Sequence, residues 1–355
     1  MNTIAGLSSN ALYAKAKALF AEHLTAGVYE ELAGMTDLAE FTSFLRTKTP
    51  YGAAFEAVGQ NGRLSRRQLE GIIKRMTLMR LEKILRYASL CDDGISDYFR
   101  MKHECECIIR RLRQEGDYEL DSYFMYVPDG FFKKTCFDLY ALERACTPKA
   151  VLEVLEGTPY EKPLARVFSF DADPQKDKEN TRQVPENLLY SALYEHSAAI
   201  FKKKLDAKSY PEVEKLLASL GDMLAIGTFY RIKKYYPEKE DMLRLHVYRS
   251  PLTRLSAAQR SSLEHAADIS AFIAALDTTC YKKLVPLMKS EKAAIAAKQY
   301  LYDYCRAQFS MTSDAALTAL CFSAQISAEA DNLITLAEGI CVGARAEEMT
   351  ALLIR

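Results

Sequence analysis

The stretch Leu38–Phe55, LAEFTSFLRTKTPYGAAF, decides how this chain folds. An apolar helical run leads into Thr49-Pro50-Tyr51. Proline disfavours the α conformation in the residue before it, so we expect the first helix to stop at this point. Thr49 is a residue type that caps helices, and Pro50 is well tolerated in the first turn of a new one. The stretch therefore predicts a helix, a sharp corner and a second helix.

The same pattern recurs twice further along the chain. Residues 148–164, PKAVLEVLEGTPYEKPL, contain Thr158-Pro159-Tyr160, and residues 269–285, ISAFIAALDTTCYKKLV, contain Thr279-Cys280-Tyr281. In the second copy, Glu161 follows Thr158 by three residues, which predicts a capping box. A second element recurs in the same order, in which an acidic residue is expected to begin an apolar helical stretch: Glu104, Asp222 and Glu329.

These recurrences predict three similar helical units, near 1–117, 118–233 and 234–355. The repeats are spaced by roughly 110–120 residues, which is too long for a two-helix solenoid repeat. Three like units in one chain favour a pseudo-threefold arrangement, in which Tyr51, Tyr160 and Tyr281 occupy equivalent places.

The composition supports an all-α fold. Of the 355 residues, 49% are apolar, whereas only 11 are Pro and 15 are Gly, which is few for the many turns of an all-β protein. Lys and Arg together number 47, as do Asp and Glu, so the chain lacks the basic field typical of a nucleic-acid binder. The nine scattered Cys indicate reduced thiols.

No segment predicts insertion into a membrane. The N-terminal stretch has no basic region before an apolar one, and one of the longest uncharged runs, at 315–328, is shorter than a span requires. We therefore expect a soluble protein whose link to any membrane is peripheral. The polar stretch 171–185, bounded by proline, predicts an exposed linker.

Two stretches suggest metal chemistry, and neither completes a site. Asp92, Asp93 and Asp97 resemble the aspartate-rich magnesium motif of class I terpene synthases, but the nearest second motif, at 331–338, departs in residue type and spacing. His103, Cys105 and Cys107 resemble zinc ligands, yet Cys105 and Cys107 are two apart and would face different sides of a helix. His103 and Cys107, four apart, could share an ion, but zinc would still need two further ligands. We expect buried core cysteines, and no catalytic residue, cofactor or structural metal.

A basic segment is the remaining candidate for a binding role. Eight Lys and Arg residues lie between Arg63 and Leu90: Arg63, Arg66, Arg67, Lys74, Arg75, Arg80, Lys83 and Arg86. Two interpretations are open, the solvated face of an amphipathic helix or a docking face for an acidic partner or lipid headgroups. The first five of these residues are the predicted partner-binding set.

The chain resembles the C-type subunit of the archaeal and bacterial A- and V-type rotary ATPases, the family that includes the d-type subunit of eukaryotic vacuolar ATPases. The N-terminal helix is similar in form and carries Tyr13, Lys15 and Lys17 before the first corner. The tail is similar as well, with the following residues: Glu329, Asn332, Leu333, Gly339, Gly343, Glu347 and Leu352. The departures are Cys280 in place of proline, and Cys107 and Ala225 in place of the tail's asparagine.

The resemblance implies a non-catalytic, funnel-shaped component of the central stalk, on the cytoplasmic face of the membrane. It implies a socket that receives the central shaft, built from the D and F proteins of the complex, and rests on the membrane rotor ring, with membrane contact only through the complex. The residues alone leave two alternatives open, a helical-repeat scaffold of another assembly and an all-α class I terpene synthase.

Overall fold

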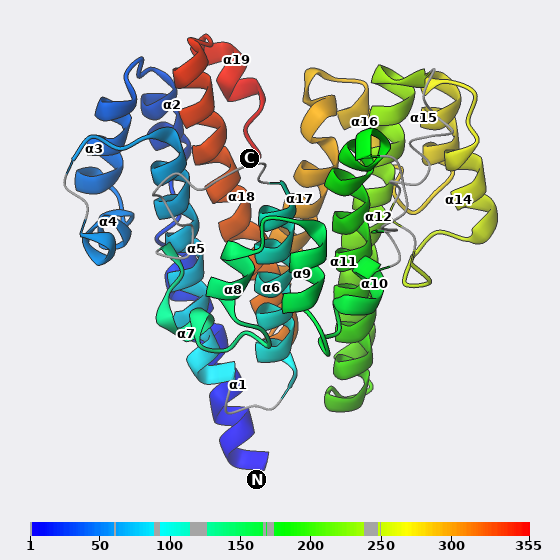
Figure 1. Cartoon of the computed structure of the whole chain (residues 1–355), viewed down its shortest axis with the longest axis horizontal. Helices are drawn as coiled ribbons and strands as arrows, with labels where there is room; N and C mark the ends of the chain where they lie inside the picture. The colour runs from blue at the N-terminus through cyan, green and yellow to red at the C-terminus, as the bar shows by residue number, and fades with distance from the viewer. Residues whose placement is uncertain are drawn as a thin grey trace. The chain divides into compact units, whose positions relative to one another are not determined.

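The computed structural model describes residues 2–59, 62–88, 93–113, 126–165, 168, 174–237, 248 and 250–355, with no side chains described at 2–7, 132 and 174–185. Every regular element in these ranges is an α-helix or a short 3₁₀ helix, which confirms the all-α prediction (Figure 1). Each described helix is too short or too polar to cross a membrane.

The chain divides into two compact units, and the first gathers segments from both ends of the sequence. It takes residues 1–95, 119–133 and 290–355. Its helices are α1 Asn2–Phe20, α2 Ala26–Ala33, α3 Leu38–Lys48, α4 Gly52–Val58, α5 Arg66–Ala88, α7 Asp129–Phe132, the 3₁₀ helix η4 Glu291–Ile295, α17 Ala296–Met311, α18 Ala315–Val342 and α19 Ala346–Ala351. Helix α18 packs against α1, α5 and α17.

The second unit takes residues 96–118 and 134–289. Its helices are α6 Ile95–Arg113, α8 Leu139–Arg144, α9 Pro148–Val154, α10 Glu161–Ala165, α11 Pro174–Lys204, α12 Tyr210–Tyr235, α14 Ala257–Glu264, α15 Ile269–Asp277 and α16 Leu284–Met288. The long helices α11 and α12 pack against each other, and α14 and α15 pack on α12.

The core of the first unit joins the N-terminal corner to the C-terminal helices. Phe41, Leu45 and Tyr51 belong to one buried cluster with Leu333 and Leu353. These side chains come from opposite ends of the sequence, so the unit forms only when the two ends pack together.

The predicted linker at 171–185 is wrong from Pro174 onward, because α11 begins there; residues 171–173 lie outside the described part. The physical reason lies in the composition of the stretch. Its Gln, Lys, Glu and Arg residues are favourable in helices, and Pro174 stands at the helix start, where the missing N–H costs nothing. Polarity alone therefore misidentified a helix as a loop.

The division into units near 1–117, 118–233 and 234–355, and their arrangement around a threefold axis, stay predictions. The local structure at the three corners, in contrast, can be compared bond by bond.

Candidate functional site

The three Thr-x-Tyr corners share one local structure. In each, the threonine hydroxyl donates to the carbonyl of a buried leucine near the end of the preceding helix, at 2.6–2.7 Å, and accepts the N–H of the tyrosine two residues on, at 3.0–3.3 Å. The threonines are Thr49, Thr158 and Thr279, and their tyrosines are Tyr51, Tyr160 and Tyr281. All three tyrosines are fully buried. The third corner has the same two threonine bonds although Cys280 stands in place of proline.

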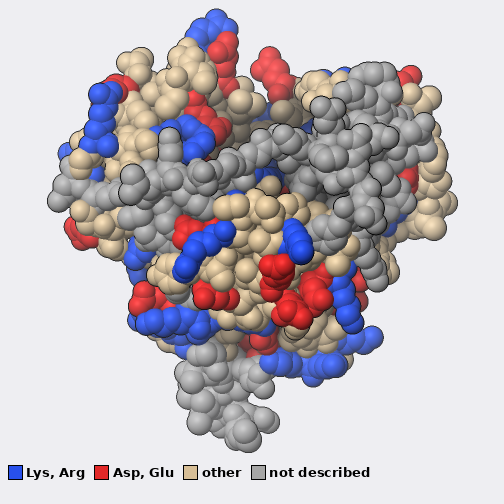
Figure 2. All heavy atoms as spheres, viewed as in Figure 1, with Lys and Arg blue, Asp and Glu red and all other residues tan. Residues whose placement is uncertain are grey.

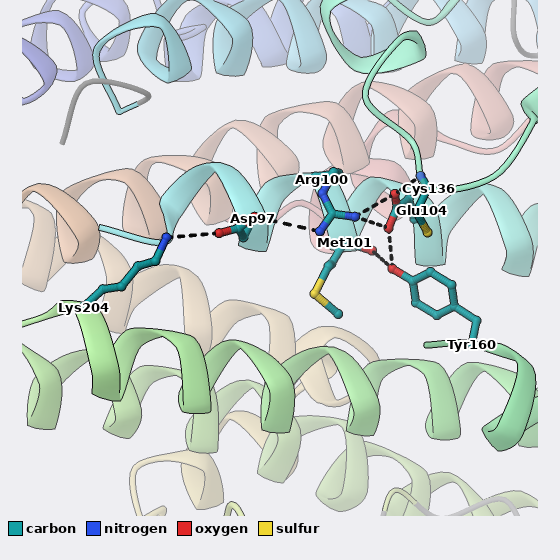
Figure 3. Close-up of polar contacts among 7 residues, drawn as sticks. All are labelled: Asp97, Arg100, Met101, Glu104, Cys136, Tyr160 and Lys204. Carbon is teal, nitrogen blue, oxygen red and sulfur yellow. Dashed lines mark hydrogen bonds and ion pairs between the residues drawn. The ribbon is translucent and has the colours of Figure 1, made fainter. Parts of the chain in front are cut away.

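Each buried tyrosine donates its hydroxyl to a buried carboxylate on a long helix. At the second corner, the Tyr160 hydroxyl lies 2.6 Å from Glu104 Oε2 of α6 (Figure 3). The other oxygen, Oε1, accepts the backbone N–H of Cys136 at 2.7 Å. The Arg100 guanidinium reaches both oxygens, at 3.0 and 3.1 Å. The carboxylate is therefore satisfied on all sides, as burial requires.

The first corner uses a carboxylate from the far end of the sequence. The Tyr51 hydroxyl donates to Glu329 Oε1 of α18 at 2.9 Å, across 278 residues. Arg80 of α5 donates to the same oxygen at 2.5 Å, and the two charged side chains are each 1% exposed. The Leu24 N–H and His23 Nδ1 contact Oε2 at 2.9 and 3.0 Å.

The third corner repeats the arrangement with a shorter acid. The Tyr281 hydroxyl donates to Asp222 Oδ2 of α12 at 2.5 Å, and the Arg254 N–H donates to the same oxygen at 2.8 Å. The Thr253 hydroxyl donates to Oδ1. The Arg254 guanidinium lies over the Tyr281 ring, 5.3 Å from its centroid, as Arg80 lies over Tyr51 at 5.5 Å.

Burial sets the protonation of these junctions. It is the main cause that raises the pKa of Tyr51, Tyr160 and Tyr281 well above the usual range of a phenol, and the facing carboxylate adds to it. Burial alone would also raise the pKa of Glu329, but the bond with His23 and the Arg80 charge outweigh it and lower that pKa to about 2. The tyrosines are thus donors at neutral pH, and Glu329 is an ionised acceptor.

Two sequence predictions about these residues are wrong. Glu104, Asp222 and Glu329 do not begin helices; each lies well inside α6, α12 or α18, and the tyrosine, arginine and backbone donors make its burial tolerable. The capping box at Thr158 is replaced by neighbouring bonds. Thr158 accepts the Tyr160 N–H, and Glu161 accepts the Gly157 N–H at 2.8 Å.

The family-like residues of the tail have specific structural roles. The Asn332 side chain makes two bonds to the backbone of Ile354, donating to its carbonyl and accepting from its N–H, both at 2.8 Å. Gly343 ends α18 in the left-handed conformation, with φ of 70°. A Cβ on Gly339 would lie 2.3 Å from Met349 Sδ, so any larger residue here would require the Met349 side chain to move.

The similar N-terminal helix also has a role. The Lys17 ammonium donates to the Phe309 carbonyl and lies 3.9 Å from the centroid of the Phe309 ring. Lys17 also lies over the Tyr13 ring, 5.2 Å from its centroid. These contacts hold α1 against α17.

The predicted partner-binding residues lie on α5 or just before it, and they are in different environments. Arg63 and Arg67 are exposed. Arg66 pairs with Glu338 at 2.7 Å, and Lys74 pairs with Glu70 at 2.6 Å. Arg75 is half-buried, and burial lowers its pKa. Their role in docking stays a prediction.

Arg80 shows that the basic segment is not a single solvated face, because this residue lies in the core against Glu329. The face of the molecule in Figure 2 shows Lys and Arg interspersed with Asp and Glu over its described atoms. On that face the described charges form a mixed surface.

The metal candidates do not come together. Among the described residues, no three His, Cys, Asp or Glu side chains are placed to share an ion. His103 and Cys107 are both buried, with Nε2 and Sγ 3.5 Å apart. Burial lowers the pKa of His103 to about 4, so the imidazole is neutral at physiological pH.

The aspartates of the terpene-synthase motif already have partners. Asp93 accepts the Ile95 N–H at 3.1 Å, and Asp97 pairs with Lys204 at 3.4 Å (Figure 3). Asp331 pairs with Lys298 at 2.6 Å. Asp92 lies outside the described residues. The described carboxylates of both stretches thus have partners within the protein.

Sequence reasoning missed the residues that complete each junction. Leu24, Cys136 and Arg254 give a backbone N–H to the buried acid, and such a contribution leaves no mark in side-chain type. Arg100 could have been found, because it precedes Glu104 by four residues on a helix, the spacing of a local ion pair.

A family model described as the ATP synthase (C/AC39) subunit matches residues 12–352. No curated protein matches this chain. The match spans all three corners, all three buried acids and Asn332, and on this ground the chain belongs to the ATP synthase (C/AC39) subunit family.

Proposed function

We propose that this chain is a non-catalytic component of the central stalk of a rotary ATPase, and that it couples the central shaft to the membrane rotor ring. The observation that carries the proposal is the family match over residues 12–352. In this role the protein receives the shaft, formed by the D and F proteins, on one side and meets the rotor ring on the other. It works at the cytoplasmic face of the membrane and contacts it only through the complex.

The junctions give this role a physical basis. A protein that passes torque between two partners needs helices that keep their directions under load. Charge-assisted hydrogen bonds are directional, and those to Glu104, Asp222 and Glu329 are buried, where water does not compete for them. Each junction therefore holds a short helical corner at a fixed angle on a long helix.

The direct test is the composition of the membrane ATPase purified from the source organism. The proposal expects this chain in the complex together with the shaft and the ring. A complex with a different polypeptide between shaft and ring, and without this chain, would refute it. Capture of this chain by an unrelated assembly would support the alternative, a helical-repeat scaffold.

The docking face is tested by reversing charge on the exposed basic residues. We propose that Arg63 and Arg67 contact an acidic surface of a complex partner. Changing both to Glu should weaken assembly with the ring or the shaft, and the loss should shrink at high salt because salt screens exposed charges. Changing the exposed Lys202 and Lys203 to Glu is the matched control. If both double variants assemble equally well, the α5 residues are not the docking face.

A further inference from the structure

We propose that Tyr51 and Glu329 form a latch that joins the two ends of the chain, so that the first helical corner belongs to the last long helix. The three buried junctions carry this inference, and it does not depend on the proposed partners. A module here means one long helix together with the corner whose tyrosine bonds to its buried acid.

Two of the modules are consecutive in the sequence. Glu104 of α6 lies 56 residues before Tyr160, and Asp222 of α12 lies 59 residues before Tyr281. In both modules the long helix comes first, followed by a loop that gives a backbone N–H to the acid, and then by the corner helices. This order is the same in the two copies.

The first corner reverses that order. Its acid, Glu329, follows Tyr51 by 278 residues and comes from α18. The preceding loop still gives its N–H, from Leu24, to this acid. The first module thus has the same kinds of bonds as the other two, but its corner lies near the start of the sequence and its long helix near the end. It is a circularly permuted version of the other two modules.

The junction between Tyr51 and Glu329 also has the most deeply buried pair of charged side chains. Closing a long loop costs more chain entropy than closing a short one. Glu329 is held by Tyr51, Leu24, His23 and the buried Arg80, whereas Arg100, the arginine partner of Glu104, remains 31% exposed. The additional hydrogen-bond donors are thus found at the junction that closes the longest loop, where the entropic cost of loop closure is largest.

This grouping changes the boundaries expected from sequence. The segment 26–58, which holds α2, α3 and α4, forms a module with α18, and residues 139–165 and 257–288 form modules with α6 and α12. We expect 26–58 to open and close as one body, with Glu329 controlling the equilibrium even though it is distant in sequence.

Amide hydrogen exchange on the full chain tests the latch. Glu329→Gln removes the charge that four donors share, and it should speed exchange in 26–58 by roughly 10- to 100-fold, the effect of losing a hydrogen bond to a charged group. The matched variants Glu104→Gln and Asp222→Asn should speed exchange in 139–165 and 257–288 instead. Acceleration of 26–58 by Glu104→Gln, or its absence in Glu329→Gln, would overturn the proposal.

A milder variant covers the case in which Glu329→Gln does not fold. Tyr51→Phe removes one hydroxyl and keeps the ring and the ion pair. The pKa of the Glu329 carboxyl, followed by NMR, should then rise because the carboxylate loses a donor. Tyr160→Phe should leave that pKa unchanged. An unchanged Glu329 pKa in Tyr51→Phe would show that the first corner is not latched to α18.

Discussion

Removing the buried positive charge at the first junction should destabilise the protein more than the loss of any other arginine at the three corners. Arg80→Met replaces a guanidinium that is 1% exposed with an uncharged side chain of similar reach. Glu329 then stays buried but loses its closest partner, the guanidinium 2.5 Å from Oε1. Breaking a buried ion pair in this way typically costs about 3–5 kcal/mol of the free energy of unfolding.

The assay is urea-induced unfolding followed by circular dichroism, with the wild type and two further variants. Arg100→Met is the matched control, because Arg100 makes the same kind of pair with Glu104 but is partly exposed, so its loss should cost less. The double variant Arg80→Met/Glu329→Gln should be more stable than Arg80→Met alone, since it removes the stranded charge.

The reasoning fails under either of two results. If Arg80→Met lowers the free energy of unfolding by less than about 1 kcal/mol, the pair behaves like an exposed one. If the double variant is no more stable than Arg80→Met, the loss comes from the packing of the arginine stem and not from an uncompensated carboxylate.

Three further predictions address pH and the tail. Because the pKa of Glu329 is lowered from 4.5 to about 2, its ionisation contributes roughly 3 kcal/mol to the free energy of unfolding above pH 4.5, and this contribution is lost as pH falls toward 2. Acid unfolding of Glu329→Gln should therefore depend less on pH in this range than that of the wild type. Equal acid sensitivity of the two proteins would contradict the stabilising role of the ionised Glu329. Asn332→Leu removes both hydrogen bonds to the buried backbone of Ile354 and should lower the free energy of unfolding in urea by about 2–3 kcal/mol. The amide hydrogen of Ile354 should also exchange faster, and an unchanged exchange rate would argue against this role of Asn332. Gly339→Ala should lower the free energy of unfolding by about 1–3 kcal/mol, because its methyl group would crowd Met349. Adding Met349→Ala should relieve this clash. A double variant whose loss of stability equals the sum of the two single losses would refute the packing argument.

Local structure could be predicted from the sequence where a short motif determines its own backbone geometry. The corner at Thr49–Tyr51 was predicted from the effect of proline on the residue before it, and the structure has the helix end at Lys48 and the next begin at Gly52. The recurrence of Glu104, Asp222 and Glu329 was also visible. The hydrogen-bond partners of these acids could not be predicted, because the partner of Glu329 lies 278 residues away and is set by the packing of the folded chain, not by local spacing.

Both errors came from judging a stretch by residue type alone. Glu104, Asp222 and Glu329 each precede apolar residues at the same spacing and were therefore expected to begin helical stretches. In the structure each lies in the middle of a helix, where a tyrosine, an arginine or a backbone N–H makes its burial tolerable. The polar stretch 171–185 was expected to be a linker, but its charged residues have good helix propensity, and α11 begins at Pro174.

The differences between the junctions bear on how three similar corners find the right helix. Apolar packing tolerates exchange among helices of similar composition, whereas a buried carboxylate without its donors costs the full desolvation of the charge. The α12 acid is an aspartate reached by Thr253, the α6 acid is a glutamate with its own Arg100, and the α18 acid needs Arg80 and His23. A corner placed on the wrong helix would keep its tyrosine bond but lose the loop N–H positioned for its own acid. The junctions thus discriminate between near-identical partners, which three repeated corners in one chain require and which apolar contacts alone do not provide.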